Sequence, residues 1–228
     1  MKNKILTIVL GVFIGVFILT VSIGLPIYFR PFYYMQIKPL DIPSYSGEDY
    51  DTIKEAYDDL LDYLTLPGKE FKTGIFRYSA EGKSHFEDCK RLFNLNGAAL
   101  IISLAGIITL FVLAKKKVFT PIKPFGYDIL FSSGSFTLGF FALVGLIVAI
   151  DFDKAFDVFH IILFPGKKNW YFNWHRDQII RVLPEEFFIS CAILILSSII
   201  LLCAACIVIP VIKKRKIGSQ QAVSKNEL

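Results

Sequence analysis

The chain has 228 residues, of which 54% are hydrophobic, and it carries a formal net charge of +5. A single domain of this length cannot bury so large an apolar fraction, so the composition excludes a soluble globular protein and predicts an integral membrane protein. The positive charge does not indicate a nucleic-acid partner, because the excess lies in short lysine clusters beside the apolar segments.

Four apolar runs are long enough to cross about 30 Å of hydrocarbon as helices that rise 1.5 Å per residue. They cover residues 5–29, 97–114, 129–150 and 187–212. The first run is too long for a signal sequence and lacks a small-x-small cleavage motif, so we interpret it as a retained anchor. The sequence therefore predicts an all-α membrane protein, with residues 1–228 forming one integral domain of four transmembrane helices.

The basic residues predict the orientation of these helices. The N-terminus, residues 115–128 and the C-terminus together hold eleven of the 25 basic residues and two of the 20 acidic ones. Because Lys and Arg are retained on the cytoplasmic side, these three segments are predicted to be cytoplasmic. Residues 30–96 and 151–186 are then extracellular and form a small cap on the outer face. The final "KNEL" lies in the cytoplasm, where it cannot act as a lumenal retention signal.

The first external loop has helical patterns. Ile53, Tyr57, Leu60, Leu61 and Leu64 form one apolar stripe, which predicts an amphipathic helix lying on the outer leaflet or on the bundle. A polar helix start, "SAEGKSHFEDCKRLF", is expected to continue without a break into the second span.

The second external loop is shorter and more aromatic. Its helical stripe consists of Phe156, Phe159, His160, Leu163 and Phe164. Beyond a Pro-Gly turn come Trp170, Tyr171, Phe172 and Trp174. Such aromatic density is typical of the headgroup region, so we expect the loop to enter the outer leaflet or to line a lipid-filled cavity.

The histidines have both structural and chemical interpretations. His160 alone is most simply a packed histidine that bonds a carbonyl. His85 has Glu81 four residues before it and Asp88 three after it, so either carboxylate can hold an imidazole nitrogen, although the three can also form a solvated charge cluster. A zinc site that includes His175 lacks any HxxxH or HExxH spacing, so no metal is expected.

The four cysteines give no disulfide framework. Cys191, Cys203 and Cys206 lie in the fourth span, where they behave as small hydrophobic residues, and only Cys89 is external. A single external cysteine argues against four-span families whose large outer loops are joined by disulfides, such as the claudins and tetraspanins.

Two motifs resemble a known family, the bacterial lipoprotein intramolecular transacylases, which are four-span membrane proteins. "EGKSHFEDC" resembles the acidic, histidine and aspartate signature before the second span of that family, and "FDVFHIILFPGKKNWYFNWHRDQIIRVLPEEFF" resembles the pattern after the third. The positions in register with the second pattern are His160, Phe164, Trp170, Phe172, Asp177, Pro184 and Phe187. Cys89 and Asn173 depart from the family, in which an aliphatic residue and commonly an aspartate stand at these positions.

The resemblance implies an acyltransferase of the bacterial cytoplasmic membrane that acts at its outer face without a cofactor. It would move the sn-2 acyl chain of a diacylglyceryl-modified lipoprotein cysteine to the α-amino group of the same cysteine. The expected partners are diacylated lipoproteins and membrane lipid, and the expected state is a monomer. The alternatives are a membrane hydrolase or intermolecular acyltransferase with the same histidines, and a lipoprotein-binding scaffold without activity.

The residue roles follow from this chemistry. The attacking amine must lose a proton, and the ester oxygen becomes negative in the intermediate. We predict that His85, oriented by Asp88 or Glu81, is the base and that His160 polarises the ester, although the order could be reversed. His175 should tolerate substitution by Ala.

The resemblance and the aromatic pattern also suggest supporting residues. Asp177 either starts the segment that leads to Pro184 or bonds a histidine or a backbone N–H. The predicted substrate-binding wall, open sideways to lipid, consists of Phe159, Phe164, Trp170 and Phe172.

Overall fold

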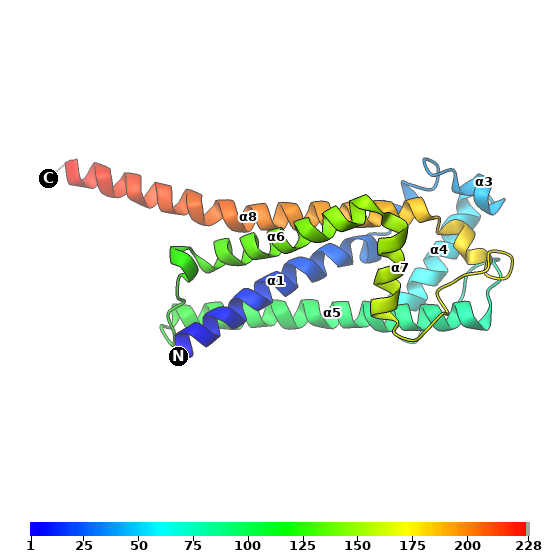
Figure 1. Cartoon of the computed structure of the whole chain (residues 1–228), viewed down its shortest axis with the longest axis horizontal. Helices are drawn as coiled ribbons and strands as arrows, with labels where there is room; N and C mark the ends of the chain where they lie inside the picture. The colour runs from blue at the N-terminus through cyan, green and yellow to red at the C-terminus, as the bar shows by residue number, and fades with distance from the viewer. Residues whose placement is uncertain (227–228) are drawn as a thin grey trace. The chain divides into compact units, whose positions relative to one another are not determined.

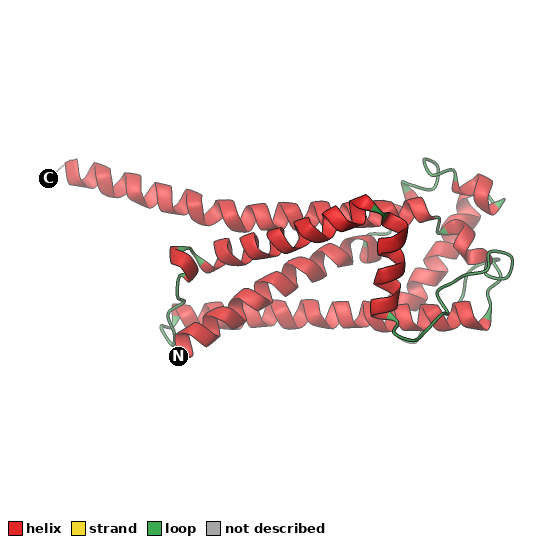
Figure 2. Ribbon diagram, in the orientation of Figure 1, coloured by secondary structure: helices red, strands yellow, loops and turns green. Residues whose placement is uncertain are grey.

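The computed structural model describes residues 1–226, with side chains described for residues 1–215. Over this part of the chain the fold is helical and contains no strand, in agreement with the predicted class (Figure 2). The helices are α1 (Lys2–Tyr28), α2 (Pro31–Tyr34), α3 (Ile42–Ser46), α4 (Tyr50–Thr65), α5 (Ala80–Lys115), η1 (Pro124–Gly126), α6 (Ile129–Ile150), α7 (Phe152–Leu163), η2 (Gln178–Val182) and α8 (Glu185–Asn226) (Figure 1).

Four helices among the described residues are long and apolar enough to cross a membrane, namely α1, α5, α6 and α8. The four predicted spans are therefore confirmed as helices. The helix α6 has the predicted bounds, whereas α5 and α8 extend beyond them. The polar start of α5 does run without a break into its apolar part, so His85 lies on the same helix before the apolar run of residues 97–114.

Side-chain caps define where the helices of the outer loops begin. The Asp49 carboxylate accepts a hydrogen bond from the Thr52 N–H at the start of α4, and the Asp151 carboxylate accepts one from the Lys154 N–H at the start of α7. The Ser79 hydroxyl accepts a hydrogen bond from the Gly82 N–H and so caps α5. Each cap satisfies an N–H that has no partner within the helix.

The fold divides into two compact units, and each of the four long helices contributes residues to both. The first unit holds Met1–Ser22, Ala99–Val144 and the chain from Leu196 onward. The second unit holds Ile23–Ala98 and Gly145–Ile195, which include all three histidines.

The first unit is held together in part by contacts between small and polar residues. The Ser22 and Ser198 hydroxyls are 3.0 Å apart, and Thr7 accepts a hydrogen bond from the Ile122 N–H. A Cβ at Gly134 would lie 2.8 Å from the Cβ of Cys206, so glycine is needed where α6 meets α8. Lys216, Lys225 and Glu227, which entered the orientation count, lie outside the part whose side chains are described.

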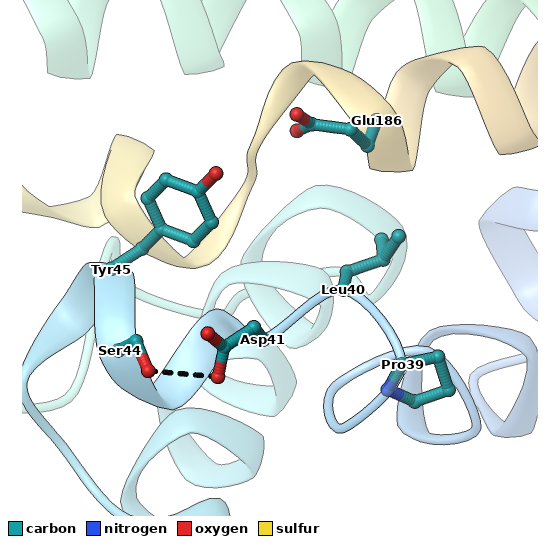
Figure 3. A pocket seen from close by; sticks show the side chains of 6 residues that line it. All are labelled: Pro39, Leu40, Asp41, Ser44, Tyr45 and Glu186. Carbon is teal, nitrogen blue, oxygen red and sulfur yellow. Dashed lines mark hydrogen bonds between the residues drawn. The ribbon is translucent and has the colours of Figure 1, made fainter.

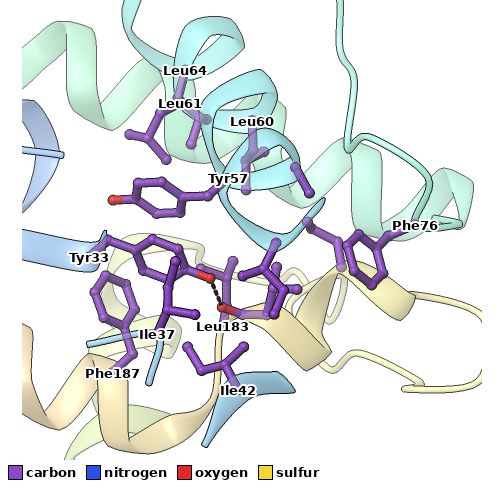
Figure 4. Close-up of a cluster of buried hydrophobic side chains, with 14 of the residues drawn as sticks. Tyr33, Ile37, Ile42, Tyr57, Leu60, Leu61, Leu64, Phe76, Leu183 and Phe187 are labelled. Carbon is purple, nitrogen blue, oxygen red and sulfur yellow. Dashed lines mark hydrogen bonds between the residues drawn. The ribbon is translucent and has the colours of Figure 1, made fainter. Parts of the chain in front are cut away.

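The core of the second unit is a cluster of buried side chains from α2, α4, η2 and the start of α8 (Figure 4). Tyr33 stacks on Tyr57 with ring centroids 3.7 Å apart, and its hydroxyl donates to the Val182 carbonyl. The members of the predicted α4 stripe, Ile53, Tyr57, Leu60, Leu61 and Leu64, are all buried in this cluster. The amphipathic helix is therefore confirmed, and its apolar stripe packs against protein side chains, each worth about 1.5–3 kcal/mol when fully buried.

A network of ion pairs attaches the segment that follows α1 to the helix α4. The Arg30 guanidinium contacts the carboxylates of Asp58 at 3.0 Å and Asp62 at 2.6 Å, and these also accept from Lys54 and Lys69. The groups are partly exposed, so their role is to set the angle between the two segments more than to add stability.

Candidate active site

The helix α7 holds His160 on its protein-facing side. His160 is buried, as its place on the apolar stripe predicted. Its Nδ1 lies 2.7 Å from the carbonyl oxygen of Phe156, one turn earlier. Because a carbonyl only accepts, Nδ1 carries the proton of the neutral ring and Nε2 remains an acceptor.

The helix α5 holds His85 in a buried position five residues after the helix begins. Its Nε2 lies 3.4 Å from the Sγ of Cys89, one turn further along the helix. Its Nδ1 is buried and has no hydrogen-bond partner among the described residues. A buried polar atom without a partner is costly, so Nδ1 is the atom of this ring that is available to a ligand.

The two imidazoles lie together in the second unit. Their ring centroids are 5.8 Å apart, with an angle of 34° between the planes. Sequence analysis predicted that these residues share a site although they are far apart in the chain. The structure brings them together.

Aromatic rings surround the imidazole pair. Trp170 stacks on His160 at 4.7 Å, and Phe164 and Phe172 meet His85 edge-on at 4.9 and 5.4 Å. Phe159 also touches His160 but is 54% exposed, so it lies at the edge of the group. All four predicted wall residues thus contact a histidine.

Burial controls the protonation of both rings. Burial, followed by the nearby His160, lowers the pKa of His85 to about 4 despite the opposing effect of Asp88. Burial also lowers the pKa of His160, against the hydrogen bond to the Phe156 carbonyl. Both imidazoles are therefore neutral at pH 7.

Asp88 does not hold the His85 ring, and this part of the prediction is wrong. Its carboxylate oxygens accept from the Lys167 ammonium at 2.5 and 2.6 Å and from the Asn169 amide at 3.0 Å. Burial alone would raise the pKa of Asp88, but the hydrogen bonds from Lys167 and Asn169 bring it below its ordinary value. Asp88 therefore fastens the loop after α7 to α5.

Glu81 does not orient His85 either. It is exposed, and its carboxylate pairs with Arg176 at 3.3 Å. The spacing of four residues allowed a contact with His85, but Arg176 competes for the carboxylate from the other loop. The pair is solvent-exposed and contributes little to stability.

Asp177 bonds a backbone N–H, which is one of the roles considered for it. Its buried carboxylate accepts from the Ser79 N–H at 2.7 Å, just before α5 begins. A Cβ at Gly82 would lie 2.4 Å from this carboxylate, so only glycine allows the approach. The contact joins the segment before η2 to the start of the helix that carries His85.

Sequence reasoning missed Lys167, Asn169 and Gly82. Lys167 lies 79 residues after Asp88, and no local pattern links the two. The Asn169 amide also donates to the Ser84 hydroxyl, which strengthens the same connection. The sequence shows the Pro-Gly turn before Lys167, but it does not show that Lys167 bonds Asp88 on α5.

The remaining candidates lie outside this group. His175 is exposed, and its Nε2 accepts from the Trp174 indole N–H. In the described part of the chain, no set of three or more His, Cys, Asp or Glu residues is placed to hold a metal ion. A pocket of about 380 Å³ is lined by Pro39, Leu40, Asp41, Ser44, Tyr45 and Glu186, and thus by no histidine (Figure 3).

Comparisons with known proteins identify the family and the fold. The family model "Lipoprotein intramolecular transacylase Lit" matches residues 8–188. The structure resembles the membrane-integral lipoprotein intramolecular transacylase Lit from Bacillus cereus with a TM-score of 0.84 and 27% identity, covering 94% of this chain and 98% of that one. Two solved mutants of the same enzyme match with TM-scores of 0.78 and 0.77, at 25% and 27% identity, and cover 94% or more of each chain.

One curated relative is an uncharacterised protein from Aquifex aeolicus. It is 26% identical over 117 residues, which are 51% of this chain and 48% of the relative, so the match spans about half the length of each. The relative adds a distant similarity without a functional description. The family model and the solved structures, by contrast, cover most of this chain. The chain therefore belongs to the Lit family of lipoprotein intramolecular transacylases, which are membrane-integral acyltransferases.

Proposed function

We propose that this chain moves the acyl group from the sn-2 ester of a diacylglyceryl cysteine to the α-amino group of that cysteine in a bacterial lipoprotein. The product is an N-acylated lipoprotein whose glyceryl group carries one chain fewer. The observation that carries the proposal is a pair of buried, neutral imidazoles 5.8 Å apart, one with a free Nδ1 and the other with an acceptor Nε2.

The contacts favour His160 as the base, the reverse of the order preferred from sequence. Its Nδ1–H is bonded to the Phe156 carbonyl, so Nε2 points a lone pair away from that bond. A general base works best when its pKa is near the working pH, and a ring whose pKa is about 4, such as that of His85, is a weak one. His85 is better suited to donate a hydrogen bond as a neutral imidazole.

The reaction then proceeds within one substrate molecule. The amine nitrogen attacks the ester carbonyl carbon while its proton passes to Nε2 of His160. The carbonyl oxygen, now negative, accepts a hydrogen bond from Nδ1–H of His85. When the carbon–oxygen bond to glycerol breaks, the leaving oxygen takes the proton back from His160. An ester is exchanged for an amide, and no donor or cofactor is consumed.

The aromatic residues support transfer to the amine over hydrolysis. Phe164 and Trp170 are buried against the imidazoles, and Phe172 adjoins them. Rings in these positions exclude water from the reacting carbon and provide apolar surface for acyl chains. Holding the amine beside the ester of the same molecule then supplies a large part of the rate enhancement.

The site is proposed to face the outside of a bacterial cytoplasmic membrane. The excess of lysines in the N-terminus and in residues 115–128 supports a cytoplasmic location for these segments. The histidine-bearing segments, residues 30–96 and 151–186, then lie on the outer side, where the lipoproteins of such a membrane are exposed. A monomer is sufficient, because both histidines come from one chain.

The proposal is tested with purified protein in lipid nanodiscs and a synthetic diacylated lipopeptide, followed by tandem mass spectrometry. Intramolecular transfer leaves the lipopeptide mass unchanged but moves one chain onto nitrogen. A mixture of lipopeptides with light and heavy acyl chains should give no crossed product. Crossed products would indicate an intermolecular acyltransferase, and a loss of one acyl chain would indicate a hydrolase.

Histidine variants complete the test. His160→Ala and His85→Ala should each lower the rate by about 10²- to 10⁴-fold, the usual contribution of a group that transfers a proton or stabilises the oxyanion. Co-purification with lipoprotein should persist in both variants. The matched control is His175→Ala, which should keep full activity because this ring is exposed and bonds only Trp174. A wild-type protein that binds lipoprotein but moves no acyl group would favour the scaffold interpretation, whereas full activity in both His85→Ala and His160→Ala would overturn the roles assigned to the two histidines.

A further inference from the structure

Cys89 lies within hydrogen-bonding distance of a ring nitrogen of His85. Its Sγ lies 3.4 Å from Nε2, at a distance that suits a sulfur hydrogen bond, and it stands one helical turn after the histidine. The side chain is packed against the aromatic cluster of the second unit. A cysteine in such a place is ordinarily a small packing residue, but here the thiol also contacts a ring nitrogen.

The thiol is the donor in this contact. Burial raises the pKa of the Cys89 thiol to about 12, so the sulfur keeps its hydrogen at neutral pH. An unprotonated imidazole nitrogen is a strong acceptor, whereas a thiol sulfur is a weak one. A bond from S–H to Nε2 also gives the thiol hydrogen an acceptor, which a bond in the opposite direction does not.

We propose that Cys89 is a positioning residue that holds His85 in the tautomer with the proton on Nδ1. The bond from its thiol occupies Nε2, so the neutral ring carries its hydrogen on Nδ1. That nitrogen is the buried atom for which no partner is present among the described residues. The hydrogen is therefore directed to whatever ligand enters beside the two rings.

The consequence for catalysis rests on the proposed function. His160 is fixed with its proton on Nδ1 by the Phe156 carbonyl and offers a lone pair. His85, fixed by Cys89, offers a hydrogen. The two rings are therefore complementary, because an attacking amine needs an acceptor for its proton and an ester oxygen needs a donor. Without Cys89, His85 would populate both tautomers, and one of them would place a lone pair against the oxyanion.

The tautomer can be measured directly by ¹⁵N NMR of histidine-labelled protein in nanodiscs. The chain has only three histidines, so the His85 signals are assigned by comparison with the His160→Gln and His175→Gln variants. The expected result at neutral pH is a protonated Nδ1 and an unprotonated Nε2 on His85. In Cys89→Ala the Nε2-protonated form should appear, and Cys89→Ser, which keeps a donor, should restore much of the original spectrum.

Activity provides the second readout. Cys89→Ala should lower kcat about 2- to 13-fold, the value of one hydrogen bond of ordinary strength, with KM little changed. Cys191→Ala is the matched control, because Cys191 packs against the same core and makes no hydrogen bond to a histidine among the described residues. It should leave both the His85 spectrum and kcat unchanged.

The outcomes separate this inference from the proposed function. A wild-type His85 protonated on Nε2, in a protein that transacylates, overturns the positioning role and leaves the function intact. The expected spectra in a protein that moves no acyl group overturn the function and leave the role of Cys89 intact. Equal spectra for wild type and Cys89→Ala would show that the thiol does not select the tautomer.

Discussion

His85 is buried as a neutral ring, and this makes the fold sensitive to acid. Its pKa is about 4 in the fold and 6.5 for a free side chain. Between these values the unfolded chain binds more protons than the folded one, so stability falls as pH falls. Above pH 6.5 the neutral His85 causes no loss in the free energy of unfolding. Below that pH the loss grows, and it is complete near pH 4. A shift of this size corresponds to at most roughly 3 kcal/mol.

We predict that a His85→Asn variant loses less stability on acidification than the wild type. Thermal unfolding in nanodiscs would be compared at pH 7.5 and pH 4.5. Carboxylates titrate in both proteins, so the difference between their two changes in Tm reports the contribution of His85. The lowered pKa of His160 acts in the same direction and remains in both. Equal changes in Tm for the two proteins would contradict a buried, neutral His85.

At the residue scale the sequence predicted that His85 and His160 share a site, and the structure places their rings 5.8 Å apart, while their catalytic roles stay a prediction. The partners predicted for His85 were wrong. His160 was placed correctly because a helical stripe reports burial directly. Asp88 and Glu81 were assigned to His85 because they share its helix, and helical spacing says only which contacts are possible. In the structure Lys167 pairs with Asp88 and Arg176 pairs with Glu81, and both basic residues come from the second external loop. Such long-range competition has no signature in local spacing.

At the scale of elements, the Asp88 carboxylate joins α5 to the loop that carries Trp170. Lys167 and Asn169 both bond Asp88, and the Trp170 indole donates to the Lys167 carbonyl. Trp170 in turn stacks on His160. The geometry of the second histidine therefore depends on an ion pair with the helix of the first.

We predict that Asp88→Asn destabilises the fold by about 1.5–3 kcal/mol, the usual value of a hydrogen bond to a charged group. It should also shift the emission of Trp170 to the red, measured in a Trp174→Phe background in which Trp170 is the remaining tryptophan. Glu81→Gln is the control, and it should change stability by less than about 0.5 kcal/mol because its pair is exposed. An equal loss of unfolding free energy in Asp88→Asn and Glu81→Gln would contradict the prediction that the buried ion pair stabilises the fold more than the exposed one.

The helix α7 has an apolar surface that the protein does not cover. Val158, Ile161 and Ile162 are all exposed, and they point away from the buried His160. Only Asp151 separates α7 from the end of α6, one of the four helices suited to cross a membrane. An exposed apolar face that begins next to a spanning helix is expected to lie in lipid.

We predict that a tryptophan placed at Ile162 is quenched by lipids brominated on the acyl chains, relative to the parent protein. A tryptophan at Asp157 is the control, because Asp157 lies at the polar edge of the same helix. It should be quenched much less. Equal quenching at both positions would mean that α7 has no fixed orientation at the membrane surface.

The elements themselves were largely predictable. The spans and the helices α4 and α7 follow from apolar periodicity, and this signal is strong because each of these faces is either buried or in contact with lipid. The short pieces α2, α3 and η2 were not predicted. Their residues become helical where they pack into the core around Tyr33 and Ile179, which is a property of the assembled fold.

At the scale of the whole molecule, the number of spans and the family are confirmed, while the orientation of the chain is still a prediction. Basic residues flank the ends of α5 and α6 at 115–123, and acidic residues are frequent in the second unit. The orientation matters for function, because both histidines belong to the segments assigned to the outside.

We predict that reporters fused after Lys117 or Lys216 are cytoplasmic and that an external reporter can be inserted at Gly68. The structure favours Gly68 over a position inside α4 such as Asp58. Asp58 lies inside α4 and is paired with Arg30, so an insertion there would disrupt the core, whereas Gly68 is exposed in the turn after α4 and has a positive φ of 71°. Reporters active only outside the cytoplasm should work at Gly68 and fail at Lys117. An external signal at Lys117 or Lys216 would invert the chain and place His85 and His160 on the side away from exported lipoproteins, and the proposed reaction would then lack its substrate.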